Sequence, residues 1–192
     1  MAKARAISGL AAHALTSTNA RIIAHTRLEE MEVWGRYAHD PQRSDELHDL
    51  RIAAKRLRYT LEIFADVLPE ESASVIEEVT QIQEELGALH DSDVMVALLS
   101  LCLEQQPHVA GKHAQAVEVQ QKAGKHLITN LDLVTHLLNA RTVPTQEQRD
   151  GLERLLRDTQ GQRKEQYTVF REHWDALQER GFHSEVLDIL DV

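Results

Sequence analysis

The segment from position 46 to position 59 has the sequence Glu46-Leu47-His48-Asp49-Leu50-Arg51-Ile52-Ala53-Ala54-Lys55-Arg56-Leu57-Arg58-Tyr59. Within this segment and just beyond it, apolar residues recur at intervals of three or four, at Leu50, Ala54, Leu57, Leu61, Phe64 and Leu68. Residues at these intervals lie on one side of an α-helix. The segment is therefore predicted to form a helix that buries this apolar stripe in a helical core.

A stripe of cations runs beside the apolar one. His48, Arg51, Lys55 and Arg58 are spaced by three, four and three residues, which places them on one flank of the same helix. A row of like charges destabilises an isolated helix by a few tenths of a kcal/mol per pair, and guanidinium groups match phosphate oxygens in geometry. We therefore expect an anion of repeating charge to bind this row. Pairing with acidic helices of the same chain is the alternative that the residues leave open.

The rest of the chain is also predicted to be helical. Glycine and proline are scarce, at 8 and 4 of 192 residues, and good helix formers dominate. Asp40-Pro41, Pro69-Glu70-Glu71 and a Thr145/Gln148 capping box are typical of helix starts. The fold class is predicted to be all-α, an antiparallel bundle of about six long helices in a single domain over residues 1–192. The predicted helices span residues 2–16, 18–39, 42–67, 71–104, 107–140 and 145–180, with a short one at 183–191.

Composition limits the partners and the compartment. The sequence has no run of eighteen apolar residues and no convincing export signal, so we expect a cytoplasmic protein that binds no membrane. The formal net charge of −10 argues against nucleic acid as a partner.

Cys102 is the only cysteine, which excludes intrachain disulfides and cysteine-rich zinc sites. Its apolar neighbours predict a buried, structural side chain.

No catalytic residue, metal ligand or cofactor site can be assigned from motifs. Two dipeptides, His48-Asp49 and His90-Asp91, have the residue types of metal-dependent phosphohydrolases, which makes such an enzyme one alternative function. Adjacent residues on a helix point about 100° apart, so each dipeptide is poorly suited to hold one metal ion. A helical adaptor for protein partners is the other alternative, in which an interface would use the aromatic residues Trp34, Tyr37, Trp174 and Phe182.

Three segments resemble a known family. Residues 48–62, His48-Asp49-Leu50-Arg51-Ile52-Ala53-Ala54-Lys55-Arg56-Leu57-Arg58-Tyr59-Thr60-Leu61-Glu62, resemble the signature helix of the CHAD family, the conserved-histidine α-helical domain. Residues 83–94 resemble the next helix of that family, and residues 167–174 are similar to its closing segment.

The resemblance implies an all-helical fold that binds inorganic polyphosphate through a basic, histidine-containing surface, without a cofactor. It also implies association with polyphosphate granules in the cytoplasm. Matched by motif, the residues of the polyphosphate-binding helix are His48, Arg51, Lys55 and Arg58, with Arg56 and Tyr59 as flanking candidates.

Family members commonly carry two such histidine motifs on two pseudo-symmetric halves, whereas this sequence contains one. Other basic residues of the chain could supply a second wall of the site, and the weaker candidates are Arg21, Arg163 and Arg171. A second subunit could do the same, so the sequence leaves a homo-oligomer open.

Overall fold

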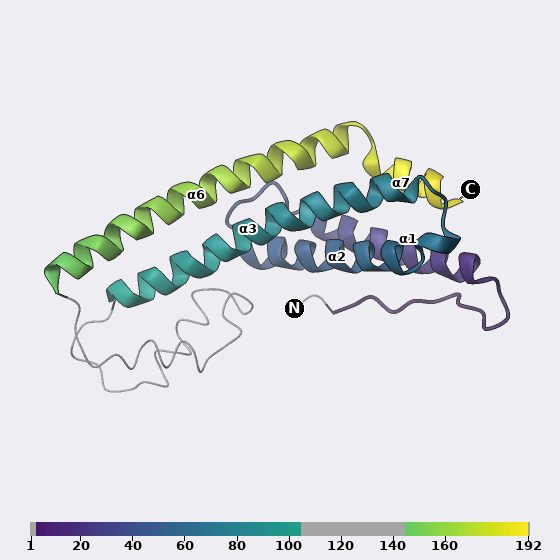
Figure 1. Ribbon diagram of the computed structural model, residues 1–192, viewed down its shortest axis with the longest axis horizontal. Coiled ribbons are helices and arrows are strands. Elements are labelled where there is room, and N and C mark those ends of the chain that lie inside the picture. The colour runs from purple at the N-terminus through teal and green to yellow at the C-terminus, as the bar shows by residue number, and fades with distance from the viewer. Residues whose placement is uncertain (1–2, 105–144, 192) are drawn as a thin grey trace. The chain divides into compact units, whose positions relative to one another are not determined.

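A computed structural model of the chain describes residues 3–104 and 145–191. The helices of the described residues are α1 (Thr16–Gly35), α2 (Ser44–Ile63), α3 (Ser72–Glu104), α6 (Gln146–Glu179) and α7 (Phe182–Asp191), and the short 3₁₀ helix η1 (Ala65–Val67) follows α2 (Figure 1). No strand occurs in these residues, and the all-α prediction is confirmed. Residues 3–104 and 145–191 contain five α-helices, whereas the sequence predicted six long ones and a short one over the whole chain. The helix predicted at 107–140 lies outside the described residues.

Several helix ends follow from local sequence. The predicted capping box forms at the start of α6, where the backbone N–H of Thr145 donates to Oε1 of Gln148 at 2.9 Å and the N–H of Gln148 donates to the Thr145 hydroxyl at 3.3 Å. Gly181, with φ of 77°, lies between α6 and α7, in a conformation that glycine adopts without strain. The start predicted at Asp40-Pro41 is early, because the Asp40 carboxylate accepts from the N–H of Gln42 in a turn and α2 begins at Ser44.

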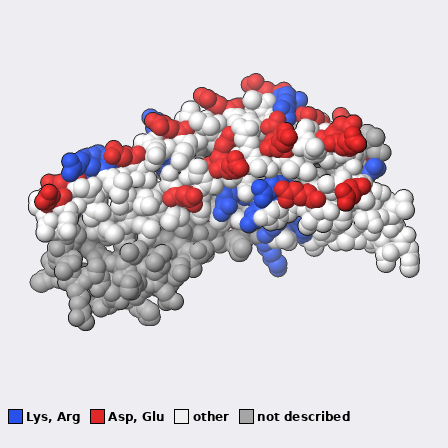
Figure 2. Space-filling view, in the orientation of Figure 1, with Lys and Arg blue, Asp and Glu red and all other residues white. Residues whose placement is uncertain are grey.

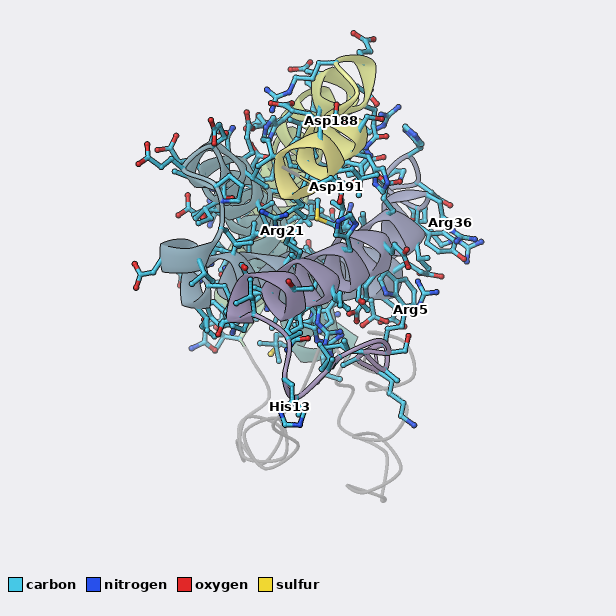
Figure 3. The ribbon with its side chains drawn as sticks, turned by 90° about the vertical axis from the view of Figure 1, so that its right-hand side faces the viewer. Arg5, His13, Arg21, Arg36, Asp188 and Asp191 are labelled. Atoms are coloured by element: carbon cyan, nitrogen blue, oxygen red, sulfur yellow. The ribbon has the colours of Figure 1, made fainter. Side chains whose placement is uncertain are left out.

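The helix predicted at 2–16 is wrong. Residues 3–15 contain no helix, and Gly9 has φ of 85°, far from the helical value. Nearly all of these residues are exposed, so alanine propensity alone would have to stabilise a short helix, which it does poorly. The segment is held to α1 instead, since the Asn19 amide exchanges two hydrogen bonds with the backbone of Ala11. Figure 3 shows Arg5 and His13 on this segment beside α1.

The chain divides into two compact units. The first comprises residues 1–87 and 168–192, and the second comprises residues 88–167, so that α3 and α6 each contribute to both. The single domain predicted from the sequence stays a prediction. By length and composition alone, residues Ser72–Leu103 of α3 could also cross a membrane, a property that core helices of soluble proteins share.

The core of the first unit forms between α1, α2, the start of α3, the end of α6 and α7. α1 packs beside α2 and α7, and the apolar stripe predicted for α2 is buried at Leu50, Ala54, Leu57, Leu61 and Leu68, with Phe64 half-buried. The end of the chain contributes Phe170, Trp174, Leu177, Phe182, Val186 and Leu190 to the buried set. Trp174 and Phe182 are therefore core residues rather than the protein interface of the adaptor hypothesis.

Polar contacts organise the second unit. The Ser92 hydroxyl on α3 donates to Oε1 of Gln166 on α6 at 2.7 Å, and Arg163 is bonded to the buried Asp93 carboxylate. Near the other end, the Arg149 guanidinium donates to the carbonyl of Leu103 at 2.9 Å. Cys102 is half-buried rather than buried as predicted, and its partial burial raises the pKa of its thiol.

Candidate functional site

The four predicted binding residues lie on one continuous helix. α2 runs without interruption from Ser44 to Ile63, so the spacing of His48, Arg51, Lys55 and Arg58 places them on one flank of it. All four side chains are half-buried, and the Nε atoms of Arg51 and Arg58 are screened from solvent. Figure 2 shows a group of Lys and Arg side chains over α2, flanked by Asp and Glu. These four residues are called the basic row below.

Tyr59 brings two cations of the basic row together. The Lys55 ammonium lies 5.4 Å from the centre of the Tyr59 ring, and the Arg58 guanidinium carbon lies 4.9 Å from it. Both distances are within the range of cation–π attraction. Arg58 also faces Glu62, but the distance of 3.4 Å from Nε to Oε1 is longer than that of a normal hydrogen bond. Tyr59, predicted as a flanking residue, therefore orients its cationic neighbours.

Arg51 has no acidic partner among the described residues, and neither has Lys55. The Nε–H group of Arg51 is screened from solvent and, within the described part of the chain, donates no hydrogen bond. Most other arginines of the first unit are paired with carboxylates, namely Arg5, Arg27, Arg43, Arg56, Arg171 and Arg180. Among the residues that the structure describes, no carboxylate therefore compensates the positive charge at the centre of the basic row.

Arg56, the other flanking candidate, faces a different direction. It is bonded to Glu30 on α1, whose side chain is only 5% exposed and which also accepts from Arg27 at 2.8 Å. Arg27 in turn donates to the carbonyl of Arg5 at 3.2 Å. The Arg56 guanidinium thus helps to hold α2 against α1, and the structure separates it from the basic row.

The three weaker candidates have different surroundings. Arg21 is half-buried on α1, and its Nε atom has no hydrogen-bond partner among the described residues (Figure 3). Arg171 is bonded to Asp175, which also lies 3.8 Å from Nδ1 of His39. Arg163 belongs to the second unit and is bonded to Asp93. Of the three, Arg21 has the surroundings most like those of Arg51.

The His-Asp dipeptides lie within regular helices. His48-Asp49 is on α2 with Asp49 buried, and His90-Asp91 is on α3 in the second unit. Among residues 3–104 and 145–191, no group of three or more His, Cys, Asp or Glu side chains could hold a metal ion.

One ionic cluster escaped the sequence analysis. Nδ1 of His173 on α6 lies 2.9 Å from Oε2 of Glu85, and its Nε2 lies 3.1 Å from Oε2 of Glu78, while Arg180 donates to Glu78 at 2.9 Å. Each ring nitrogen of His173 therefore faces a carboxylate of α3. Burial raises the pKa of Glu78, but the hydrogen bonds from His173 and Arg180 outweigh it and lower that pKa below its ordinary value. The available signal was the seven-residue spacing of the two glutamates, which places them on one face of α3.

Comparison with known proteins addresses the family. The family model of the CHAD domain matches residues 2–100, which is more than half of the chain and includes α1, α2 and almost all of α3. No curated protein and no solved structure matches the chain. The matched range contains the basic row, with Arg56 and Tyr59. The chain therefore belongs to the CHAD domain family.

Proposed function

We propose that the protein binds inorganic polyphosphate, or a polyanion of similar repeating charge, along the basic row of α2. The observation that carries the proposal is Arg51. Its guanidinium is half-buried with an unsatisfied Nε and, within the described residues, no neutralising carboxylate. A buried donor without a partner costs about 1–3 kcal/mol, and an anion that accepts from this group would remove the cost.

The length of the basic row suits a chain-like ligand. His48 and Arg58 are ten positions apart, which corresponds to about 15 Å along a helix. Several successive phosphate groups can contact a row of this length, each through a charge-assisted hydrogen bond that contributes about 1.5–3 kcal/mol. A single orthophosphate would contact only one or two of the four side chains. The proposal therefore predicts a preference for long polyphosphate over orthophosphate.

Two side chains of the basic row are held in place by their surroundings before a ligand binds. Lys55 and Arg58 share the ring of Tyr59, and the stems of both are half-buried. Side chains that are already ordered lose less conformational entropy when a ligand binds. In a chain of net charge −10, acidic surfaces around the row would repel polyanions that lie across them, so the ligand is expected to follow α2.

The test is calorimetric titration of the chelator-treated protein with long-chain polyphosphate, beside orthophosphate and duplex DNA, at about 0.15 M salt. We expect polyphosphate alone to bind, with an affinity that falls as salt rises, because bound cations release counterions from the polyanion. The proposal also predicts that the protein is found at cytoplasmic polyphosphate granules. Absence of polyphosphate binding would overturn it.

Two double variants separate a binding row from an ordinary charge effect. Arg51→Gln with Arg58→Gln should abolish binding with little change in the thermal unfolding midpoint. Arg36→Gln with Arg157→Gln removes the same charge from exposed positions outside the basic row and should leave most of the affinity. If both double variants weakened binding equally, attraction would be non-specific and α2 would not be the site.

A further inference from the structure

An exposed apolar strip follows the outer side of α2 into η1, next to the basic row. It consists of Tyr59, Ile63 and Val67, which are 42%, 75% and 37% exposed. The three residues are four positions apart, with Tyr59 and Ile63 on α2 and Val67 on η1, where the backbone N–H groups of Val67 and Leu68 donate to the carbonyl of Phe64. Contiguous exposed apolar residues bordered by charges are typical of protein contact surfaces.

The charges along one edge of this apolar strip are sorted by sign. Lys55 and Arg58 come before its centre, and Glu62 and Asp66, both exposed, come after it. Lys55, Arg58 and Glu62 are spaced by three and four residues, which keeps them on the same edge of α2, and Asp66 follows four positions later on η1. The edge is therefore positive toward the start of α2 and negative toward its end.

We infer that a second copy of this chain docks on the apolar strip, with the two α2 helices antiparallel about a twofold axis. In this arrangement Tyr59 faces the partner's Ile63, Lys55 faces the partner's Asp66 and Arg58 faces the partner's Glu62. The midpoints of these three pairs all fall at about residues 60–61 of α2, so one axis satisfies the apolar contact and both ionic contacts together.

Charge complementarity favours a second copy of the chain, in the antiparallel arrangement, as the partner that binds the apolar strip. In the antiparallel arrangement the charged edge of one copy lies along the charged edge of the other with the signs reversed, so that each cation meets an acid. A parallel arrangement would carry the two charged edges to opposite sides of the contact and leave them unpaired. The dimer contacts need no ligand, but they use Lys55 and Arg58 of the basic row, so polyphosphate and a second copy of the chain would compete for these two cations.

A single exposed residue allows the first test. Sedimentation equilibrium of the full chain, without polyphosphate, from about 1 to about 200 µM should show a reversible monomer–dimer equilibrium. Ile63→Asp places a charge at the centre of the apolar strip and should leave only monomer. Val169→Asp is the matched control, since Val169 is a β-branched residue on α6 that is 56% exposed. This variant should dimerise as the wild type does, and circular dichroism should show that both variants are folded.

Charge reversal tests the antiparallel pairing itself. Lys55→Glu with Arg58→Glu makes the edge wholly acidic, and Glu62→Lys with Asp66→Lys makes it wholly basic. Each double variant alone should be monomeric, and an equimolar mixture should form a heterodimer with at least the wild-type affinity. A wild-type chain that stays monomeric at every concentration, an Ile63→Asp variant that still dimerises, or a mixture that does not associate would each overturn the inference.

Discussion

Trp174 occupies the space that a side chain at Gly35 would need. A Cβ atom added at Gly35 would lie 2.4 Å from Cζ2 and 2.9 Å from Cη2 of the Trp174 ring, both of which are far inside van der Waals contact. Gly35 is the last residue of α1, and Trp174 is buried on α6. The missing side chain at position 35 therefore lets α6 approach the end of α1 and brings the indole into the core of the first unit.

Gly35→Ala is expected to destabilise the protein by about 1–3 kcal/mol, because a buried indole has to shift to admit a methyl group. Glycine to alanine within a helix ordinarily stabilises by about 0.5–1 kcal/mol, so the sign of the change is informative. Gly87→Ala and Gly161→Ala are the controls, since an added Cβ meets nothing within 4 Å at either position. Urea unfolding measures all three variants, and a stabilised Gly35→Ala would contradict the close contact.

Arg56 is predicted to contribute to the stability of the fold, whereas Arg51 is predicted to contribute to polyphosphate binding. Arg56→Gln should lower the free energy of unfolding by about 1–3 kcal/mol, because the buried Glu30 would lose one of the two arginines that it contacts among the described residues. Arg51→Gln should change it by less than about 0.5 kcal/mol and weaken polyphosphate binding instead. Denaturant unfolding and calorimetry give the two readouts. Adding Glu30→Gln to Arg56→Gln should cost less than the sum of the single changes, because the two residues interact directly.

The contacts of Glu78 should make the free energy of unfolding fall in acid. Its pKa is lowered from the ordinary value of 4.5 in the folded protein, so its contacts contribute stability above that value and lose it as the pH falls through the folded pKa. Glu78→Gln should therefore be less stable than the wild type at pH 7, and the difference should close as the pH falls below 4.5. Glu77→Gln, an exposed neighbour on α3, is the control. A difference that is independent of pH would show that the charge of Glu78 is not what stabilises the fold.

His48 predicts a pH dependence of binding. A histidine gains a charge and a second donor as the pH falls from about 8 to 6, so affinity for polyphosphate should rise over that interval. His48→Gln should bind with an affinity that is nearly flat with pH, and His13→Gln, exposed in the segment before α1, should keep the wild-type profile. Titrations at three pH values suffice for the measurement. A flat wild-type profile would remove His48 from the ionic contacts.

The spacing of apolar residues predicted most helices well, because a helix depends on contacts between residues that are close in the sequence. The prediction at 71–104 became α3 at Ser72–Glu104, and the one at 145–180 became α6 at Gln146–Glu179. The failure at 2–16 has a physical reason. Alanines favour a helix only slightly, and these residues have too little buried surface to add to that preference.

In the candidate site too, features that depend on nearby residues could be predicted from the sequence, and features that depend on distant residues could not. The shared flank of the basic row followed from spacing alone, since it requires only that α2 be a helix. The role of Arg56 could not be predicted, because its partner Glu30 is 26 positions away on another helix. The contacts of His173 with Glu85 and Glu78 span 88 and 95 positions. Packing between helices selects such partners, and no local pattern contains that information.

The composition of the first unit affects how the protein can fold during synthesis. Residues 1–87 and residues 168–192 build one core, so the core beside α1 and α2 lacks Phe170, Trp174 and Val186 until the ribosome has translated the segment after residue 167. A nascent chain that ends before residue 168 would present Leu28, Leu57 and other core side chains to water. Hydrophobic surface exposed in this way attracts chaperones and promotes aggregation. A premature stop codon before codon 168 should consequently yield an insoluble product rather than a shorter functional one.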